Sequence, residues 1–475
     1  MPQQHLDRLT AIDAGFLHNE GSASHMHVGA VVMLEGPPPA FEDLLDSIRS
    51  RLHLVPRYRQ KLAGAPARSG RPLWVDDPFF NVEYHVRQSA LPHPGSEQQL
   101  LRSAARIFSQ RLDRSKPLWE LWVVEGLQDQ RFALISKTHH ALVDGVGGVD
   151  LAQVLFDLAP VPQDIEHPDE PWQPAPEPHA VELMGAGATD VVRSGLTMTA
   201  GALGAMADPR RAVRQARHAA EGLGELVWAT LNPAPATPLN VEIGPHRRFL
   251  GVRKELADLK EIKNALGGTV NDVVLSVVSG ALRNWLHSRG VRTEGMELRA
   301  LVPVSIRGEA ERNALGNRIA AMRGPLPVYV EDPLLRLRTV RSAMDGLKES
   351  KQAVGAEVMA GMQSFAPPTI LAPAARINFS TRLFNLIVTN VPGPQFPLYV
   401  QGRQMQDVFP VAFLPRHHAL AIAIMSYHGH INFGLLGDYD ALPDLEVIGE
   451  GIEASVAELL ALAQREPRGG PTTPA

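Results

Sequence analysis

The chain has 475 residues, which is longer than one hydrophobic core ordinarily supports, so two domains are expected. Hydrophobic residues make up 44% of the chain and charged residues 20%, as in a soluble globular protein. The formal net charge of −5, with acids and bases interspersed, argues against a general nucleic-acid binder, because that function needs a clustered cationic surface.

Cysteine usage and the apolar segments predict a cytoplasmic protein without a membrane span. Cysteine is absent, which excludes disulfides, thiolate metal sites and a cysteine nucleophile. Residues 1–16 carry early charges and lack a long apolar core, so no signal peptide is predicted. A spanning helix needs roughly 20 apolar residues, whereas the best candidate, residues 194–207, is short and rich in Gly and Ala. Peripheral contact with a membrane or with lipid inclusions stays compatible with this sequence.

The first part of the chain has the pattern of a mixed α/β domain. Residues 27–34 form an apolar, β-rich run that ends at a Gly-Pro-Pro-Pro break, which predicts a strand. Apolar residues then recur at helical spacing in two segments, residues 41–55 and 96–112. Residues 121–127 and 132–138 flank a Gln-Asp-Gln turn and predict a hairpin, whose second strand leads into His139 and His140.

Two proline-rich stretches separate the first part of the chain from the last. Residues 158–180 are crowded with Pro, Ala and acids, and residues 232–240 form the second break. The segment between them is Gly/Ala-rich, partly basic and helical in pattern. The predicted organisation is an N-terminal domain at 1–180, a helical linker at 181–238, a C-terminal domain at 239–466 and a disordered tail at 467–475.

The last part is again α/β. Residues 270–288 predict a helix, and Thr269 and Asp272 have the Ser/Thr-x-x-acid spacing of a helix start. Three regions have strand character: residues 297–307, 383–391 and 419–436. Asp332-Pro333 opens a further helix, and residues 444–464 predict the final one.

Residues 137–151 place two adjacent histidines ahead of an Asp-Gly turn. A zinc site needs about three or four ligands, and adjacent histidines on a strand point to opposite faces, so a shared metal ion is disfavoured. Two other interpretations of these histidines stay open: a packed structural pair and a proton-transfer site. His417 and His418 also precede Ala-Leu, but they lead directly into a strand without the Asp-Gly turn, so we interpret that second pair as structural.

The stretch HHALVDG matches the HHxxxDG motif of CoA-dependent acyltransferases related to chloramphenicol acetyltransferase and to condensation domains. More narrowly, the chain resembles the bacterial wax ester synthase/acyl-CoA:diacylglycerol acyltransferase family. The supporting motifs occur in the family's order: Pro117-Leu118-Trp119, Asn271-Asp272, VPVSIR, ALGNR and TNVPGP. The resemblance covers nearly the whole chain. It implies an α/β (α+β) fold of two chloramphenicol-acetyltransferase-like domains, joined by a helical crossover, with the active site in a channel between them.

The resemblance also assigns roles within the histidine motif. The second histidine of the motif is the family's general base, which corresponds to His140. On a strand His139 should face away from His140, so it is assigned a supporting role. The resemblance implies that Asp144 is architectural and holds the motif turn. Arg307 in VPVSIR is our hypothesis for the partner of Asp144. Gly145 permits a backbone conformation or a close approach that a side chain would obstruct.

The distant motifs are implied to contact substrate. Asn271 is expected in the first turn of a helix, where its amide and the helix's free N–H groups suit an oxyanion or thioester contact. Taken without the other motifs, Asn-Asp is more simply a helix start. Pro117-Leu118-Trp119 could likewise be only a strand entrance. The implied substrate-binding residues are Pro117, Leu118, Trp119, Asp272 and Arg307.

The implied reaction is acyl transfer from acyl-CoA, as co-substrate, to diacylglycerol or a long-chain fatty alcohol, with no permanently bound cofactor or metal. Two alternatives stay open: a condensation-type acyltransferase with another acceptor or a carrier thioester, and a non-catalytic lipid-binding relative. His140, Asp144 and Gly145 weigh against the second alternative, and the ND and NVPGP motifs weigh against the first. Met359, Met362, Phe365 and Leu371 could line an acyl tunnel, but plain core is the simpler interpretation. The basic residues 210–217 suit anionic lipid or CoA phosphates, or simply a solvated linker helix.

Overall fold

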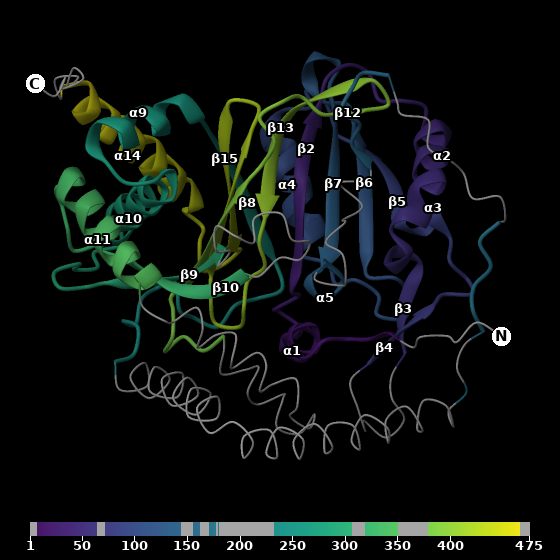
Figure 1. Cartoon of the computed structure of the whole chain (residues 1–475), viewed down its shortest axis with the longest axis horizontal. Helices are drawn as coiled ribbons and strands as arrows, with labels where there is room; N and C mark the ends of the chain where they lie inside the picture. Colours follow the sequence, from purple (N-terminus) through teal and green to yellow (C-terminus); the bar gives the residue numbers. More distant parts are fainter. Residues whose placement is uncertain are drawn as a thin grey trace, which may run out of the picture.

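The computed structural model describes most of the N-terminal and C-terminal parts of the chain (Figure 1). The described residues are 7–63, 72–143, 155–161, 171–176, 179, 232–305, 319–349 and 379–465. Two six-stranded sheets stand next to each other, with helices packed on each, and a small three-stranded sheet, in the order β1-β4-β3, lies beside the first. The mixed α/β prediction is therefore confirmed.

The first sheet has the strand order β12-β13-β2-β7-β6-β5. Its strands are β2 (His27–Leu34), β5 (Val86–Ala90), β6 (Trp119–Glu125), β7 (Phe132–His139), β12 (Tyr399–Val400) and β13 (Arg403–Val411). The small sheet holds β1 (Asp7–Arg8), β3 (Gln60–Ala63) and β4 (Leu73–Asp76). The helices of this part are α1 (Ala11–Asn19), α2 (Phe41–Arg51), α3 (Val82–His85), α4 (Glu97–Phe108) and α5 (His140–Val143). Strands β6 and β7 pair antiparallel, which confirms the predicted hairpin.

Helix ends in this part follow from local chemistry. The predicted helix at 41–55 ends at Arg51 and continues as a 3-10 turn, Leu52–Leu54, because Val55 precedes Pro56 and a residue before proline disfavours the helical conformation. Helix α4 begins after Ser96, whose hydroxyl accepts from the Gln99 N–H, while the Gln99 side chain accepts from the Ser96 N–H. The predicted segment 96–112 is therefore a helix that ends four residues earlier than its apolar pattern suggests.

The second sheet has the order β10-β9-β11-β14-β15-β8. Its strands are β8 (Arg247–Glu255), β9 (Leu298–Ser305), β10 (Ile319–Leu326), β11 (Leu386–Pro392), β14 (Leu420–Tyr427) and β15 (His430–Asp438). The helices are α9 (Leu256–Leu266), α10 (Val270–Ser288), α11 (Pro333–Glu349) and α14 (Leu445–Arg465). The strand region 419–436 holds two antiparallel strands, joined where His428 and Gly429 have positive φ of 43° and 89°.

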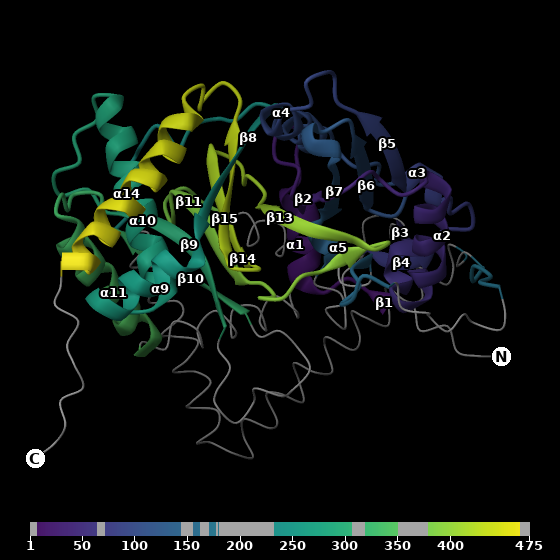
Figure 2. The ribbon, with the colours of Figure 1, turned by 90° about the horizontal axis from the view of Figure 1, so that it is seen from above.

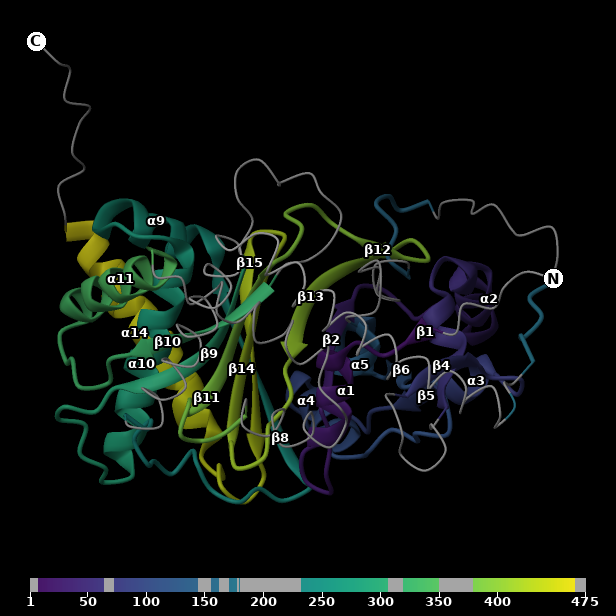
Figure 3. The ribbon, with the colours of Figure 1, turned by 60° about the horizontal axis from the view of Figure 1, so that its bottom comes forward.

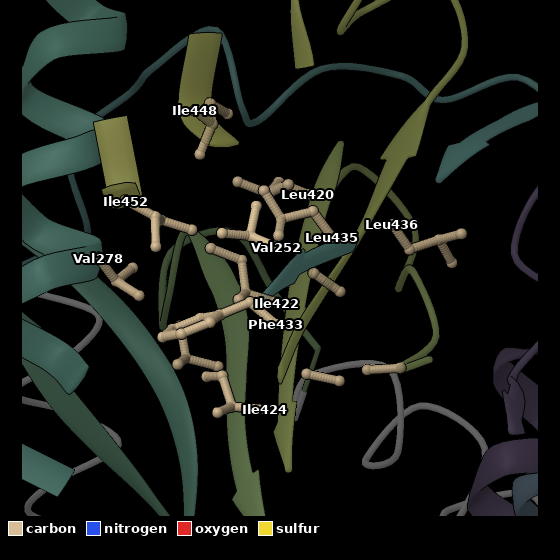
Figure 4. Close-up of a cluster of buried hydrophobic side chains, with 14 of the residues drawn as sticks. Val252, Val278, Leu420, Ile422, Ile424, Phe433, Leu435, Leu436, Ile448 and Ile452 are labelled. Atoms are coloured by element: carbon tan, nitrogen blue, oxygen red, sulfur yellow. The ribbon is translucent and has the colours of Figure 1, made fainter. Parts of the chain in front are cut away.

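Helices α9, α10, α11 and α14 gather on one side of the second sheet (Figure 2). Helix α10 has the predicted bounds, and Thr269 and Asp272 form the predicted capping box at its start. Figure 4 shows the apolar side chains between this sheet and its helices. They are Val252, Val278, Leu420, Ile422, Ile424, Phe433, Leu435, Ile448 and Ile452, all buried, whereas the buried Leu436 points to the opposite face of β15. Full burial of such a side chain stabilises the fold by about 1.5–3 kcal/mol.

Strand β13 joins the two sheets (Figure 3). It belongs to the last part of the sequence, yet it pairs antiparallel with β2 of the first sheet. Asp407 on β13 accepts from the Arg253 Nε of β8 at 2.6 Å, and Gly434 of β15 lies so close to β13 that a Cβ there would meet the Pro410 carbonyl oxygen at 1.9 Å. The first sheet is thus completed by residues 399–411.

The predicted domain limits lie largely outside the described residues, because residues 180–231 and 466–475 are not among them. The boundaries of the linker and of the tail therefore stay predictions. Within the described ranges no single helix has the length and hydropathy of a membrane span, although α9 and α10, bent by 100° where they meet, pass that test as a pair.

Candidate active site

The two motif histidines lie where strand β7 gives way to helix α5. His139 is the last residue of the strand, and its N–H donates to the Leu118 carbonyl oxygen at 3.0 Å. His140 is the first residue of the short helix, and its N–H donates to the Met26 carbonyl oxygen at 2.9 Å. His139 is 1% exposed, whereas His140 is only half-buried. Of the two imidazoles, His140 is thus the one that a substrate can reach.

The His139 side chain is held in one tautomer. Its Nδ1 accepts from the Ala141 N–H at 3.1 Å, so the ring proton resides on Nε2, which lies 3.8 Å from Glu20 Oε2. Arg114 and Arg111 bind the buried Glu20 carboxylate at 2.6 and 3.3 Å. Burial, with the positive charge of Arg114, lowers the pKa of His139 to about 3. His139 is therefore neutral, and its ring is held against the start of α5.

Aromatic rings surround His140. Phe16 of α1 stacks on its imidazole with ring centroids 4.0 Å apart and an interplanar angle of 20°. Phe413, which follows β13, meets the same imidazole edge-on at 5.4 Å. Phe379 lies 6.0 Å from Phe16 and 5.7 Å from Phe413. Residues from both ends of the chain therefore enclose His140 with apolar surface.

A second histidine lies directly across the sheet from the motif. His27 on β2 is the register partner of His139 on β7, and their ring centroids are 6.0 Å apart. Burial lowers the pKa of His27 well below its usual value, and the nearby Lys137 ammonium adds to this effect. The imidazoles behind the motif are thus uncharged near neutral pH.

Asn271 and Asp272 occupy the first turn of α10. The Asn271 side chain is half-buried, and its Oδ1 accepts from the Asn390 Nδ2 at 3.3 Å. Asp272 is 1% exposed, and its Oδ2 accepts from the N–H and the hydroxyl of Thr269, both at 2.8 Å. The capping function of Asp272 is therefore visible, while its contact with substrate stays a prediction. Sequence reasoning did not select Asn390, although it lies within the TNVPGP motif.

The Pro117-Leu118-Trp119 motif lies in the protein core at the start of β6. All three side chains are buried, and the Trp119 Nε1 donates to the Tyr58 carbonyl oxygen at 2.8 Å. The His85 imidazole stacks on the Trp119 indole, with ring centroids 4.6 Å apart. The motif anchors the histidines, because its Leu118 carbonyl oxygen holds the His139 N–H. Its predicted contact with substrate stays a prediction.

The second histidine pair agrees with its structural interpretation. His418 is fully buried, and its ring nitrogens lie 2.9 Å from the Arg416 carbonyl oxygen and 3.1 Å from that of Phe384. No cluster of three or more His, Asp or Glu side chains suited to a metal ion occurs in the described ranges.

Several predicted residues cannot be placed in this site. Those outside the described residues are Asp144, Gly145, Arg307, Met359, Met362, Phe365, Leu371 and residues 210–217.

Solved structures with the same fold include two kinds of enzyme domain. The wax ester synthase/diacylglycerol acyltransferase from Marinobacter aquaeolei VT8 is 28% identical, with a TM-score of 0.67 over 96% of this chain and 100% of that one. The starter condensation domain of rhizomide synthetase is 13% identical with a TM-score of 0.57, over 97% of this chain and 95% of that one, and shows the fold alone. The fold and the histidine motif thus define an acyltransferase of the chloramphenicol-acetyltransferase-like class.

Sequence comparison identifies the family. Residues 9–274 match the wax ester synthase/diacylglycerol acyltransferase catalytic domain, and residues 315–460 match the family's C-terminal domain. A probable diacylglycerol O-acyltransferase of Mycobacterium tuberculosis is 35% identical over 464 residues, which is 97% of each chain. This chain belongs to the wax ester synthase/diacylglycerol acyltransferase family and is an acyltransferase. The resemblance inferred from the motifs is confirmed.

Proposed function

We propose that the enzyme transfers a long-chain acyl group from acyl-CoA to the hydroxyl of diacylglycerol or of a long-chain fatty alcohol. The products are triacylglycerol or wax ester. Support comes from the full-length relatives, one named a diacylglycerol O-acyltransferase and one a wax ester synthase/diacylglycerol acyltransferase. Acyl-CoA is the co-substrate, and the proposal needs no permanently bound cofactor or metal.

His140 is the proposed general base. Its neutral imidazole takes the proton of the acceptor hydroxyl while the oxygen attacks the thioester carbonyl carbon. The carbon–sulfur bond then breaks, the ester remains with the acceptor, and the imidazolium returns the proton to the CoA thiolate. The observation that carries this role is the contrast within the motif: His140 is half-exposed beside Phe16 and Phe413, whereas His139 is buried and neutral.

Asn271 is the proposed donor to the oxyanion that forms during attack. It lies in the first turn of α10, where free N–H groups add a partial positive charge. Asp144, with Arg307 as its hypothesised partner, and Gly145 are proposed to shape the motif turn. Pro117, Leu118, Trp119, Asp272 and Arg307 complete the proposed substrate side of the site.

The proposed site is a channel between the two parts of the chain. Phe16 comes from α1 and Phe413 from the segment after β13, and both contact His140. The acceptors are water-insoluble, so the proposed location is cytoplasmic with peripheral contact to the inner membrane face or to lipid inclusions.

A CoA-release assay tests this function. Palmitoyl-CoA is supplied with hexadecanol, with dipalmitoylglycerol or with no acceptor, and release is expected only when an acceptor is present. His140→Ala should abolish release while the thermal melt is retained. His417→Asn is the matched control, because it alters the second His-His pair at a positive φ of 63°, which Asn tolerates, and it should keep full activity.

Three outcomes would contradict the proposal. Acceptor-dependent release that survives His140→Ala would exclude the general-base mechanism. If neither hexadecanol nor dipalmitoylglycerol stimulates CoA release, the proposed acceptors are excluded. Turnover only with an amine acceptor or a carrier-protein thioester would favour a condensation-type reaction.

A further inference from the structure

The TNVPGP motif meets the Asn-Asp motif through one hydrogen bond. Asn390, near the end of β11, donates through Nδ2 to Asn271 Oδ1 at 3.3 Å. The two residues are 119 positions apart in the chain. Both side chains are half-buried, so each is packed in the fold and also reaches solvent. The strand end and the first turn of α10 are thereby joined at the residue that is the proposed oxyanion donor.

The rest of the motif fixes the position of Asn390. Asn390 and Pro392 are paired in parallel register with Ile424 and Ser426 of β14. The next residue, Gly393, lies against the same strand: a Cβ there would stand 2.2 Å from the Ser426 carbonyl oxygen, and its N–H donates to the Ser426 hydroxyl at 3.3 Å. The end of β11 is therefore held against β14, which fixes where Asn390 lies in the sheet.

In this hydrogen bond Asn390 is the donor, so it binds the oxygen end of the Asn271 amide. An Asn side chain has an acceptor oxygen on one end and a donor NH₂ on the other, and its neighbours determine the orientation. Because Asn390 donates, it binds the Asn271 oxygen, and the Asn271 NH₂ points elsewhere. An oxyanion needs a donor, so this is the productive orientation.

We propose that Asn390 is a positioning residue that orients the Asn271 amide with its NH₂ toward the reacting carbonyl. Asn390 acts through Asn271 and does not itself touch the reacting atoms. The inference rests on the proposed role of Asn271 in acyl transfer. A merely structural Asn390 would instead affect stability and would act independently of Asn271.

A double-mutant cycle on kcat separates these two roles. Asn271→Ala should lower kcat by about 10²–10³-fold, the usual cost of an oxyanion donor. Asn390→Ala should lower kcat by roughly 10-fold with little change in KM, because a loosened donor mainly affects the transition state. In the Asn271→Ala background, Asn390→Ala should have almost no further effect, since residues that act as a unit are non-additive.

Asn390→Asp is the second variant, because it preserves the shape of the side chain. A carboxylate can only accept, so it would attract the Asn271 NH₂ and turn the amide around. It should therefore lower kcat more than Asn390→Ala does, with a thermal melt close to that of the wild type.

The inference is overturned if the kcat losses of Asn271→Ala and Asn390→Ala multiply in the double mutant. It is also overturned if Asn390→Asp has the same kcat as the wild type. Neither result affects the proposed function, which is tested separately by the acceptor dependence of CoA release in the wild type and in His140→Ala. A wild-type kcat for Asn271→Ala would exclude the oxyanion role, and the Asn390 inference with it.

Discussion

The residues around the motif differ in charge state although all of them are buried, because their polar partners differ. His139 and His27 are buried and neutral. Lys137, two positions before His139 on strand β7, is instead a fully buried cation. Its ammonium donates to the Ile107 carbonyl oxygen at 3.0 Å and lies 3.5 Å from Glu120 Oε2. Burial lowers the pKa of Lys137 to about 8, and Glu120 opposes that shift. Lys137 therefore binds a carbonyl at the end of α4 and a carboxylate on β6.

Lys137→Met should destabilise the protein by about 3 kcal/mol, because removing one partner leaves Glu120 buried with less compensation. The destabilisation should lie near the lower end of the usual range for a broken buried ion pair, because Arg87 stays 3.2 Å from Glu120 and still pairs with it. Urea unfolding followed by circular dichroism measures the change. Adding Glu120→Gln to the first variant should recover part of the loss, and wild-type stability in Lys137→Met alone would contradict the prediction.

At the scale of elements, the end of β11 depends on one glycine. Gly393 lies so close to β14 that any side chain would collide with the Ser426 backbone. Strand β11 also holds Asn390, so its displacement would change the contact with Asn271 in the proposed active site as well as the packing. Local sequence pattern predicted the strand, but the contact with α10 depends on how the sheet and the helix meet.

Gly393→Ala should lower kcat by at least 10-fold and destabilise the fold by about 1–3 kcal/mol, the usual cost of overpacking. Steady-state kinetics and thermal melts check both effects. Gly429→Ala is the comparison variant, because a Cβ there meets nothing within 4 Å and the turn is strained only by its positive φ of 89°. It should reduce stability without the loss in kcat, so an equal kcat loss in both variants would contradict a specific role for Gly393.

For the whole molecule, buried neutral histidines make stability depend on pH. Burial lowers the pKa of His139 to about 3 and that of His85 to about 4, and it lowers the pKa of His27 well below the usual value. Below the ordinary histidine pKa of 6.5 the unfolded chain binds protons that the folded chain does not. Stability is therefore fully present above that pH and is lost as the pH falls toward the folded values.

Between pH 7 and pH 5.5 the free energy of unfolding should fall by at least about 2 kcal/mol, since His139 and His85 each contribute up to about 1.4 kcal/mol per pH unit. His27, His25 and His418, whose pKa values burial also lowers, add to this loss. Urea unfolding at several pH values measures this slope. His85→Gln should reduce the slope, because it removes one of the contributing histidines. A free energy of unfolding that stays constant over this range would contradict the assignment.

Local pattern was sufficient for the elements with clear apolar periodicity. Strand β2 and helix α10 have their predicted bounds, and the capping box at Thr269 and Asp272 forms as expected, because these features depend on residues a few positions apart. The HHxxxDG, ND and NVPGP motifs were sufficient for the family, which sequence comparison confirms.

The sequence by itself thus determined the elements with clear apolar periodicity, the family and the identity of the motif histidines. Only the tertiary structure decided that β13 completes the first sheet, that Phe16 and Phe413 enclose His140, and that Asn390 binds Asn271. Each of these contacts joins residues more than a hundred positions apart. No periodicity encodes such a contact, because it depends on which buried faces and strand edges meet when the two sheets pack together.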